Sequence, residues 1–138
     1  MSTNKDQDII LSICIPTFNR EAILRENLKQ IRSKTSDYQN SVEILVGNNG
    51  SIDDTKYFLE KLEDFKTINL KENNGINSVL FRLANEAKGK YLWLLGDDDF
   101  LVGDIFDIVV NKIKEFKDIK HSFFITGRTY SSISDLKI

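Results

Sequence analysis

Short apolar runs alternate with amphipathic stretches along this 138-residue chain, and this alternation limits the folds open to it. Strands are predicted over residues 9–15, 42–46, 67–70, 91–95 and 122–126, which are rich in β-branched and aromatic residues. Helices are predicted over 21–34, in a stretch after Ser51, over 76–88 and over 103–116. Such alternation implies a mainly parallel sheet with helices on both faces. We therefore expect a three-layer α/β/α sandwich with a Rossmann-like sheet.

Three consecutive aspartates follow the fourth predicted strand. The run 91–95 is wholly apolar and stops at Gly96, which is typical of a strand buried on both faces of a parallel sheet. Asp97, Asp98 and Asp99 come next. Two unit charges about 4 Å apart interact by about 4 kcal/mol at an effective dielectric of about 20, and a divalent cation would turn that repulsion into coordination. The stretch is therefore either a cation site or a solvated acidic turn before a helix.

Polar residues also follow the first predicted strand. Pro16 is expected to end this strand, and Thr17, Asn19 and Arg20 come before the next helix. Thr17 or Asn19 could cap that helix. Because ligands of open α/β sheets bind beyond the carboxyl ends of strands, the same three residues could instead contact a ligand.

The loop after the second predicted strand is flanked by glycines. Asn48 and Asn49 could offer amide groups to a nucleotide, although turn geometry also explains the glycines. Ser51 and Asp54 have the spacing of a capping box, which predicts a helix rather than a hairpin after Asn49. If the strand order is 3-2-1-4, the loops after strands 1, 2 and 4 converge on one site.

The helix predicted over 76–88 has the most regular apolar stripe in the chain. Gly89 suits its C-terminal cap. Arg82 lies at the edge of the stripe, where it is either a solvated residue or a group that points toward the aspartates.

Composition excludes several classes of protein. The net charge is −2, so nothing indicates a nucleic-acid partner. One cysteine and one histidine leave no ligand set for zinc. The single cysteine, Cys14, lies within an apolar run and is interpreted as a small core residue of a protein in a reducing compartment. No apolar run reaches the length of a membrane span, and we expect a cytoplasmic protein.

Four segments in order resemble the nucleotide-binding half of family 2 glycosyltransferases, which have the GT-A fold. They are SICIPTFNR (12–20), EILVGNNGSIDDT (43–55), ENNGINSVLFRLANEAKGKYLWLL (72–95) and GDDDFLVGD (96–104). The first is similar to a strand that ends in Pro-Thr-Tyr-Asn-Arg. The last carries an Asp-x-Asp signature. The match covers most of residues 9–116.

The resemblance implies transfer of a sugar from a nucleotide-diphosphate sugar to an acceptor hydroxyl, with Mn²⁺ or Mg²⁺ as the divalent cation. It implies a metal site at Asp97 and Asp99, with Asp99 as the first choice of ligand, and a place for Asn49 at the base, where the family often has an aspartate. A UDP- or dTDP-sugar donor is favoured. The residues that it assigns to nucleotide-sugar binding are Pro16, Thr17, Asn19, Arg20, Asn48, Asn49, Ser51, Asn74, Arg82, Asp97 and Asp98.

Family members continue into an acceptor-binding half, which carries the general base of inverting members. We therefore expect residues 1–138 to be a single GT-A-type domain truncated before that half, and we assign no catalytic residue. The isolated chain is expected to bind donor without useful transfer, and its exposed apolar surface predicts homo-oligomers. The acceptor would be a glycan or a lipid-linked glycan, which would bring the protein to the inner face of the membrane. The alternative is a non-catalytic nucleotide-sugar-binding module.

Overall fold

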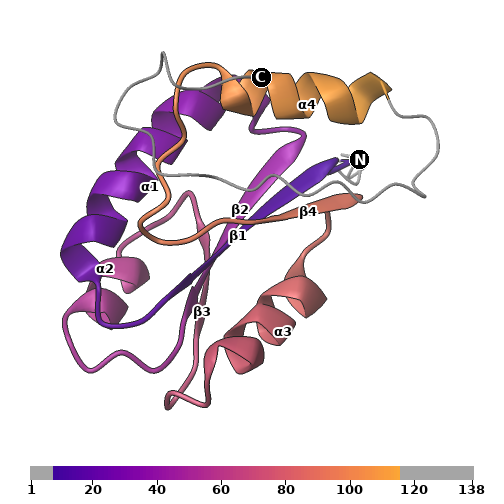
Figure 1. The fold of residues 1–138 in the computed structure, drawn as a ribbon. Coiled ribbons are helices and arrows are strands. Elements are labelled where there is room, and N and C mark those ends of the chain that lie inside the picture. The colour runs from indigo at the N-terminus through magenta and orange to yellow at the C-terminus, as the bar shows by residue number, and fades with distance from the viewer. Residues whose placement is uncertain (1–7, 116–138) are drawn as a thin grey trace, which may run out of the picture. The chain divides into compact units, whose positions relative to one another are not determined.

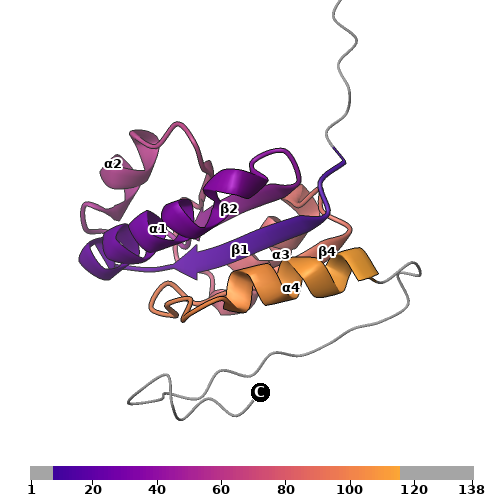
Figure 2. The same ribbon diagram turned by 90° about the horizontal axis from the view of Figure 1, so that it is seen from above.

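The computed structural model describes residues 8–115, and the first compact unit of the chain extends to Phe100. Its centre is a four-stranded sheet in the order β3-β2-β1-β4, in which every neighbouring pair is parallel. The strands are β1 (Leu11–Thr17), β2 (Val42–Asn48), β3 (Lys66–Asn69) and β4 (Tyr91–Leu94). The predicted parallel sheet and its 3-2-1-4 order are confirmed, and the central position of β1 can be followed in Figures 1 and 2.

Helices cover both faces of this sheet. α1 (Glu21–Thr35) and α2 (Thr55–Glu60) lie on one side, and α3 (Ile76–Glu86) lies on the other (Figure 1). A short 3-10 helix, η1 (Ser36–Tyr38), follows α1. The three layers expected from the alternation of apolar runs are therefore present within this unit.

The face of the sheet below α3 shows why the apolar positions alternate. Cys14 and Leu45 point to this face and form a core cluster with Val79 and Leu83 of α3. Gly47 lies directly below the helix, because a Cβ atom there would come within 2.5 Å of Val79 Cγ2. A larger residue at position 47 would push α3 away from the sheet.

β1 extends two residues beyond its predicted end. The prediction that Pro16 ends the strand is wrong, since Pro16 is paired with Gly47 of β2. The backbone groups of Cys14 face β4, where its carbonyl accepts a hydrogen bond from Leu95 N–H at 3.0 Å. Pro16, two residues on, faces the same side. The pairing with β4 ends at Cys14, so the proline removes no sheet hydrogen bond.

The apolar run of β4 predicted a strand buried on both faces, but one face of β4 is partly exposed. Leu92 and Leu94 are 39% and 52% exposed, while Leu95 is buried. They are paired with Ser12 and Cys14, so they lie on the face that α3 covers. α3 packs against β1 and β2, and this part of β4 lies beyond that contact. The apolar run therefore predicted the strand correctly but not its burial.

The position of Gly89 predicted a C-terminal cap for α3, but Gly89 does not cap this helix. The helix ends at Glu86, and Ala87 has extended backbone geometry. Gly89 instead approaches β1, where its N–H donates to Ser12 Oγ at 2.8 Å. A Cβ atom at position 89 would lie 2.5 Å from the backbone nitrogen of Ser12, so this glycine permits close packing of two chain segments.

A second compact unit begins at Leu101 and contains α4 (Ile105–Glu115). The buried residues of α4 are Phe106, Val109, Val110 and Ile113, which follow the helical period and agree with the helix predicted over 103–116. The strand predicted over 122–126 lies outside the described residues. Over residues 8–115, no helix has both the length and the apolar character needed to span a bilayer.

Candidate functional site

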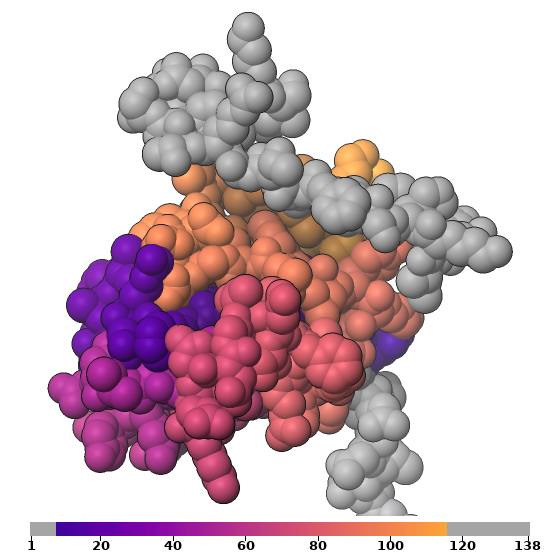
Figure 3. Space-filling model, turned by 60° about the horizontal axis from the view of Figure 1, so that its bottom comes forward, coloured from indigo at the N-terminus to yellow at the C-terminus, as the bar shows by residue number. Residues whose placement is uncertain are grey.

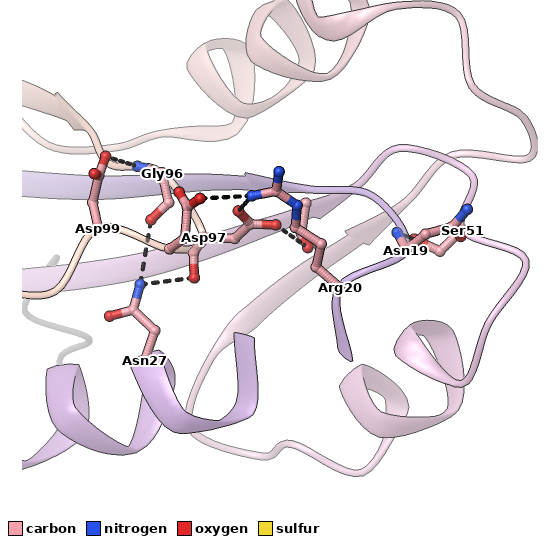
Figure 4. Close-up of polar contacts among 9 residues, drawn as sticks. Asn19, Arg20, Asn27, Ser51, Gly96, Asp97 and Asp99 are labelled. Atoms are coloured by element: carbon pink, nitrogen blue, oxygen red, sulfur yellow. Dashed lines mark hydrogen bonds and ion pairs between the residues drawn. The ribbon is translucent and has the colours of Figure 1, made fainter. Parts of the chain in front are cut away.

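Three loops meet at the carboxyl edge of the sheet. They follow β1, β2 and β4, whose carboxyl ends lie at the same edge because the strands are parallel. Thr17 Oγ1 donates a hydrogen bond of 2.7 Å to Asp97 Oδ2, which joins the loops after β1 and β4. Asn19 N–H donates to Ser51 Oγ at 2.9 Å, which joins the loops after β1 and β2. The predicted convergence of the loops is therefore present (Figure 4).

Asp97 is the buried member of the three aspartates. It is 6% exposed, and both of its carboxylate oxygens accept hydrogen bonds. Oδ2 accepts from Thr17, and Oδ1 accepts from Arg20 Nη1 at 3.2 Å. The same nitrogen of Arg20 donates to Asp98 Oδ2 at 2.7 Å. One guanidinium therefore sits between two adjacent carboxylates.

This arrangement offsets the repulsion expected within the aspartate run. The negative charge of Asp97 is the largest of the effects that raise the pKa of Arg20, and a hydrogen bond to Asp98 adds to it. The Arg20 side chain is 52% exposed, so the ion pairs themselves stabilise the fold little. Their main consequence is geometric, because they hold Arg20 over the carboxyl end of β4.

Asp99 points away from the Asp97 carboxylate (Figure 4). Its Oδ2 atom accepts a hydrogen bond of 2.9 Å from Gly96 N–H, and its own N–H donates to the Gly96 carbonyl at 3.2 Å. A Cβ atom on residue 96 would lie 2.6 Å from Asp99 Oδ2. Gly96 therefore leaves room for this tight turn. Asp97 and Asp99, the predicted metal ligands, do not share a partner in the described contacts.

Asn27 of α1 supports the aspartate loop from below. The side chain is fully buried, and its Nδ2 group donates to the carbonyls of Gly96 and Asp97 at 3.3 and 3.1 Å. This residue was not among those predicted from the sequence. The signal was available, because Asn27 is a polar residue on the buried stripe that includes Leu24 and Leu28.

Neither Thr17 nor Asn19 caps α1. The N-cap residue is Arg20, and it makes no side-chain capping bond. Asn19 has a left-handed backbone with φ of 52°, which asparagine tolerates better than most residues. Its Oδ1 atom accepts from Ile52 N–H at 2.8 Å, so its side chain bridges to the next loop.

The predicted capping box at Ser51 and Asp54 is also wrong. Asp54 is the N-cap of α2, but no side chain closes that end. Asp53 does part of this work, since its Oδ1 atom accepts from Thr55 N–H at 3.0 Å and its Oδ2 atom accepts from Glu21 N–H at 3.4 Å. The hydroxyl of Ser51 instead accepts the hydrogen bond from Asn19 N–H. One aspartate that the motif did not include therefore binds the first turns of both α1 and α2.

Two amide pairs lie at the carboxyl end of β2, whose last residue is Asn48. Asn48 is buried, accepts from Ser51 N–H with Oδ1 and donates from Nδ2 to Asn69 Oδ1, both at 2.9 Å. Asn49 is also buried and donates from Nδ2 to Asn73 Oδ1 at 3.0 Å. The loop after β2 touches the loop before α3, and Figure 3 shows the two on the same face of the molecule. The sequence analysis assigned Asn74, and the structure brings its neighbour Asn73 to Asn49.

Two predicted residues stand apart from the aspartates. Asn74 and Arg82 are exposed, and no hydrogen bond or ion pair of the described region joins either of them to Asp97, Asp98 or Asp99. Arg82 acts on Glu86 instead. The pKa of Glu86 is lowered mainly by the hydrogen bond from Lys66 and its charge, and the charge of Arg82 adds a smaller effect.

The parallel sheet in the order β3-β2-β1-β4, with polar loops at its carboxyl edge, is an open α/β fold of the nucleotide-binding type. The sequence profile described as "Glycosyl transferase family 2" matches residues 12–130. This match extends over most of the chain, so the chain belongs to glycosyltransferase family 2.

Characterised relatives agree with this membership. A "GalNAc(5)-diNAcBac-PP-undecaprenol beta-1,3-glucosyltransferase" of Campylobacter jejuni is 30% identical over 110 residues, which are 76% of this chain and 35% of the relative. The "Abequosyltransferase RfbV" of Salmonella typhimurium is 28% identical over 116 residues, which are 80% of this chain and 34% of the relative. The chain thus spans about a third of the length of these relatives.

Solved structures show the same fold. S. aureus TarS 1-349 in complex with UDP-GlcNAc superposes with a TM-score of 0.69 at 22% identity, over 78% of this chain and 32% of that chain. The mannosyltransferase PcManGT from Pyrobaculum calidifontis, in complex with GDP-Man and Mn2+, superposes with a TM-score of 0.62 at 20% identity, again over 78% of this chain and 32% of that chain. The described sheet is therefore that of a GT-A glycosyltransferase.

Proposed function

We propose that this chain binds the donor, a nucleotide-diphosphate sugar, at the carboxyl edge of its sheet, and that the protein moves the sugar to an acceptor hydroxyl. The observation that carries the proposal is the hydrogen bond between Thr17 and Asp97, which joins the carboxyl ends of β1 and β4 around buried and exposed polar groups. Family membership supports the reaction type, and the UDP-GlcNAc and GDP-Man complexes of TarS and PcManGT support the class of donor.

Residues of the site have separate roles in this proposal. The segment at Thr17, Asn19 and Arg20 and the segment at Asn48, Asn49 and Ser51 surround the nucleoside, and Pro16 lies beside them near the end of β1. Asn74 lies before α3 and Arg82 lies within it, so they contact the donor only if the donor extends toward α3. Asp97 holds Thr17 and Arg20 in place, and the hydrogen bonds that both of its carboxylate oxygens already accept favour this positioning role over direct metal contact.

The carboxylates fit a divalent cation that is shared with the donor. No three His, Cys, Asp or Glu side chains of residues 8–115 converge as a complete metal site. Mg²⁺ and similar ions usually need only one or two protein carboxylates, since substrate phosphates and water complete the coordination. Asp98 and Asp99 are both exposed, and since Asp99 is turned toward Gly96 N–H, one of the two carboxylates at a time would supply such a ligand in this arrangement. When bound, such a cation stabilises the negative charge on the departing nucleotide.

The acceptor is proposed from the relatives alone. The Campylobacter enzyme is named for an undecaprenol-linked glycan, so we propose a glycan or lipid-linked glycan as the acceptor and work at the cytoplasmic face of the membrane. Hexosyl transfer and polysaccharide biosynthesis belong to the same proposal.

Calorimetric titration of the chain with UDP tests the site, first with Mn²⁺ and then with a chelator. The expected result is binding with Mn²⁺ that the chelator abolishes. At about 100 times the dissociation constant, the ligand should stabilise the fold by about 2.7 kcal/mol. Equal binding without metal would contradict the role of the cation, and no binding of any nucleoside diphosphate would contradict the site. Multiple turnovers onto a glycan acceptor would exclude the alternative of a non-catalytic nucleotide-sugar-binding module.

A further inference from the structure

Asn49 holds a buried hydrogen-bond acceptor without a partner. The residue is 4% exposed, and its Oδ1 atom makes no hydrogen bond in the part of the chain that the structure describes. A buried polar group left in this way costs about 1–3 kcal/mol. Asn49 directly follows β2, and its N–H donates to the carbonyl of Thr17, the last residue of β1, at 2.9 Å, so this oxygen belongs to the carboxyl edge where the proposed donor binds.

The direction of the Asn49 amide is determined by its neighbours. Asn73 Oδ1 accepts a hydrogen bond of 2.9 Å from the backbone N–H of Gly75, and a backbone N–H can only donate. The same oxygen accepts from Asn49 Nδ2 at 3.0 Å. The nitrogen of Asn49 must therefore face Asn73, and its oxygen must face the other way.

We propose that Asn73 determines base specificity by turning Asn49 into an acceptor only, an inference that rests on the nucleotide site of the proposed function. An amide that was free to rotate could donate or accept, and would discriminate poorly between bases. Held by Asn73, Asn49 acts on the base as an aspartate would, but without a charge. Asn73 is a positioning residue, since it acts on the base through Asn49.

The ligand class follows from the chemistry of the base ring. Uracil and thymine carry hydrogen on N3, and guanine carries hydrogen on N1, so each can donate to Asn49 Oδ1. Cytosine N3 and adenine N1 are acceptors and would face another acceptor. A site built to bind an N–H group rejects an analogue that lacks it. Since Oδ1 is closed to solvent in this structure, the base must displace the groups that cover it.

The test compares UDP and CDP, two pyrimidine nucleotides of the same ring size, by calorimetric titration of the 138-residue chain with Mn²⁺ and without it. We expect the wild type to favour UDP by about 5- to 150-fold, which corresponds to one buried group left unsatisfied. In Asn73→Ala the ratio should fall by roughly 2- to 12-fold, since the orientation of Asn49 depends on one net hydrogen bond.

Two further variants separate positioning from general loss of stability. Asn73→Asp keeps an acceptor for both Asn49 Nδ2 and Gly75 N–H, so it should keep the preference for UDP. Asn69→Ala is the matched control, because it makes the same change of side chain at the residue that accepts a hydrogen bond from Asn48, the neighbour of Asn49. This variant should also keep the preference for UDP over CDP.

The outcomes distinguish this inference from the proposed function. A wild-type chain that binds UDP and CDP equally, or an unchanged ratio in folded Asn73→Ala, would overturn the role of Asn73 while leaving the nucleotide site intact. If Asn73→Ala does not fold, a lost preference in Asn73→Asp would overturn it as well. Failure of the wild type to bind any nucleoside diphosphate would refute the proposed function itself.

Discussion

The hydrogen bond between Thr17 and Asp97 gives a direct measure of how the site supports the fold. We consider Thr17→Val, which removes the hydroxyl and keeps the volume of the side chain. Thr17 is 4% exposed and Asp97 is 6% exposed, so water cannot easily replace the lost donor. A hydrogen bond to a charged group is worth about 1.5–3 kcal/mol. Because Asp97 keeps the contact of 3.2 Å with Arg20, we expect a loss of about 2 kcal/mol, toward the lower end of that range.

Urea denaturation at pH 7 measures this effect. Urea m-values of about 1–3 kcal/mol per molar predict a fall of about 1 M in the unfolding midpoint. Thr17→Ser is the matched control, because it keeps the hydroxyl and should lose much less stability. A cycle with Asp97→Ala then isolates the coupling between the two residues. Equal stability of Thr17→Val and wild type, or equal losses in the valine and serine variants, would refute the reasoning.

Three further predictions address the turn, the helix starts and the core. Gly96→Ala should destabilise the chain by about 1–2 kcal/mol in urea melts, since the new Cβ would lie 2.6 Å from Asp99 Oδ2 and displace its hydrogen bond; an unchanged midpoint would contradict this. Burial acts to raise the pKa of Asp53, but hydrogen bonds from Thr55 and the backbone lower it overall below 3.8. The stabilisation that the Asp53 carboxylate gives the fold is therefore full above pH 3.8 and is lost as the pH falls through the lower folded-state pKa. Melts at pH 7 and pH 3 should show this pH-dependent stabilisation in the wild type and not in Asp53→Asn. Burial, followed by the charge of Glu43, raises the pKa of Cys14 to about 12, so iodoacetamide at pH 8 should label the folded chain far more slowly than the chain in guanidinium, and similar rates would show that the thiol is accessible.

The site shows where local patterns stop being informative. The sequence placed polar groups after β1, β2 and β4, and their convergence followed once the strand order was assumed. It did not predict that Asp97 would be buried while Asp99 turns back to Gly96, because three identical residues in a row carry no local difference. It also missed Asn27 and Asn73, whose roles depend on partners 69 or more and 24 residues away.

The sequence by itself determined the α/β class, the order of strands and helices and the family, because apolar periodicity and short motifs are properties of neighbouring residues. Tertiary structure decided which face of β4 stays exposed, how Pro16 fits inside a central strand, and which of two adjacent asparagines reaches Asn49. These outcomes depend on the register of strands and on contacts of about 3 Å between loops, which hydrogen bonding requires. Such contacts exist only after the sheet has brought distant segments together.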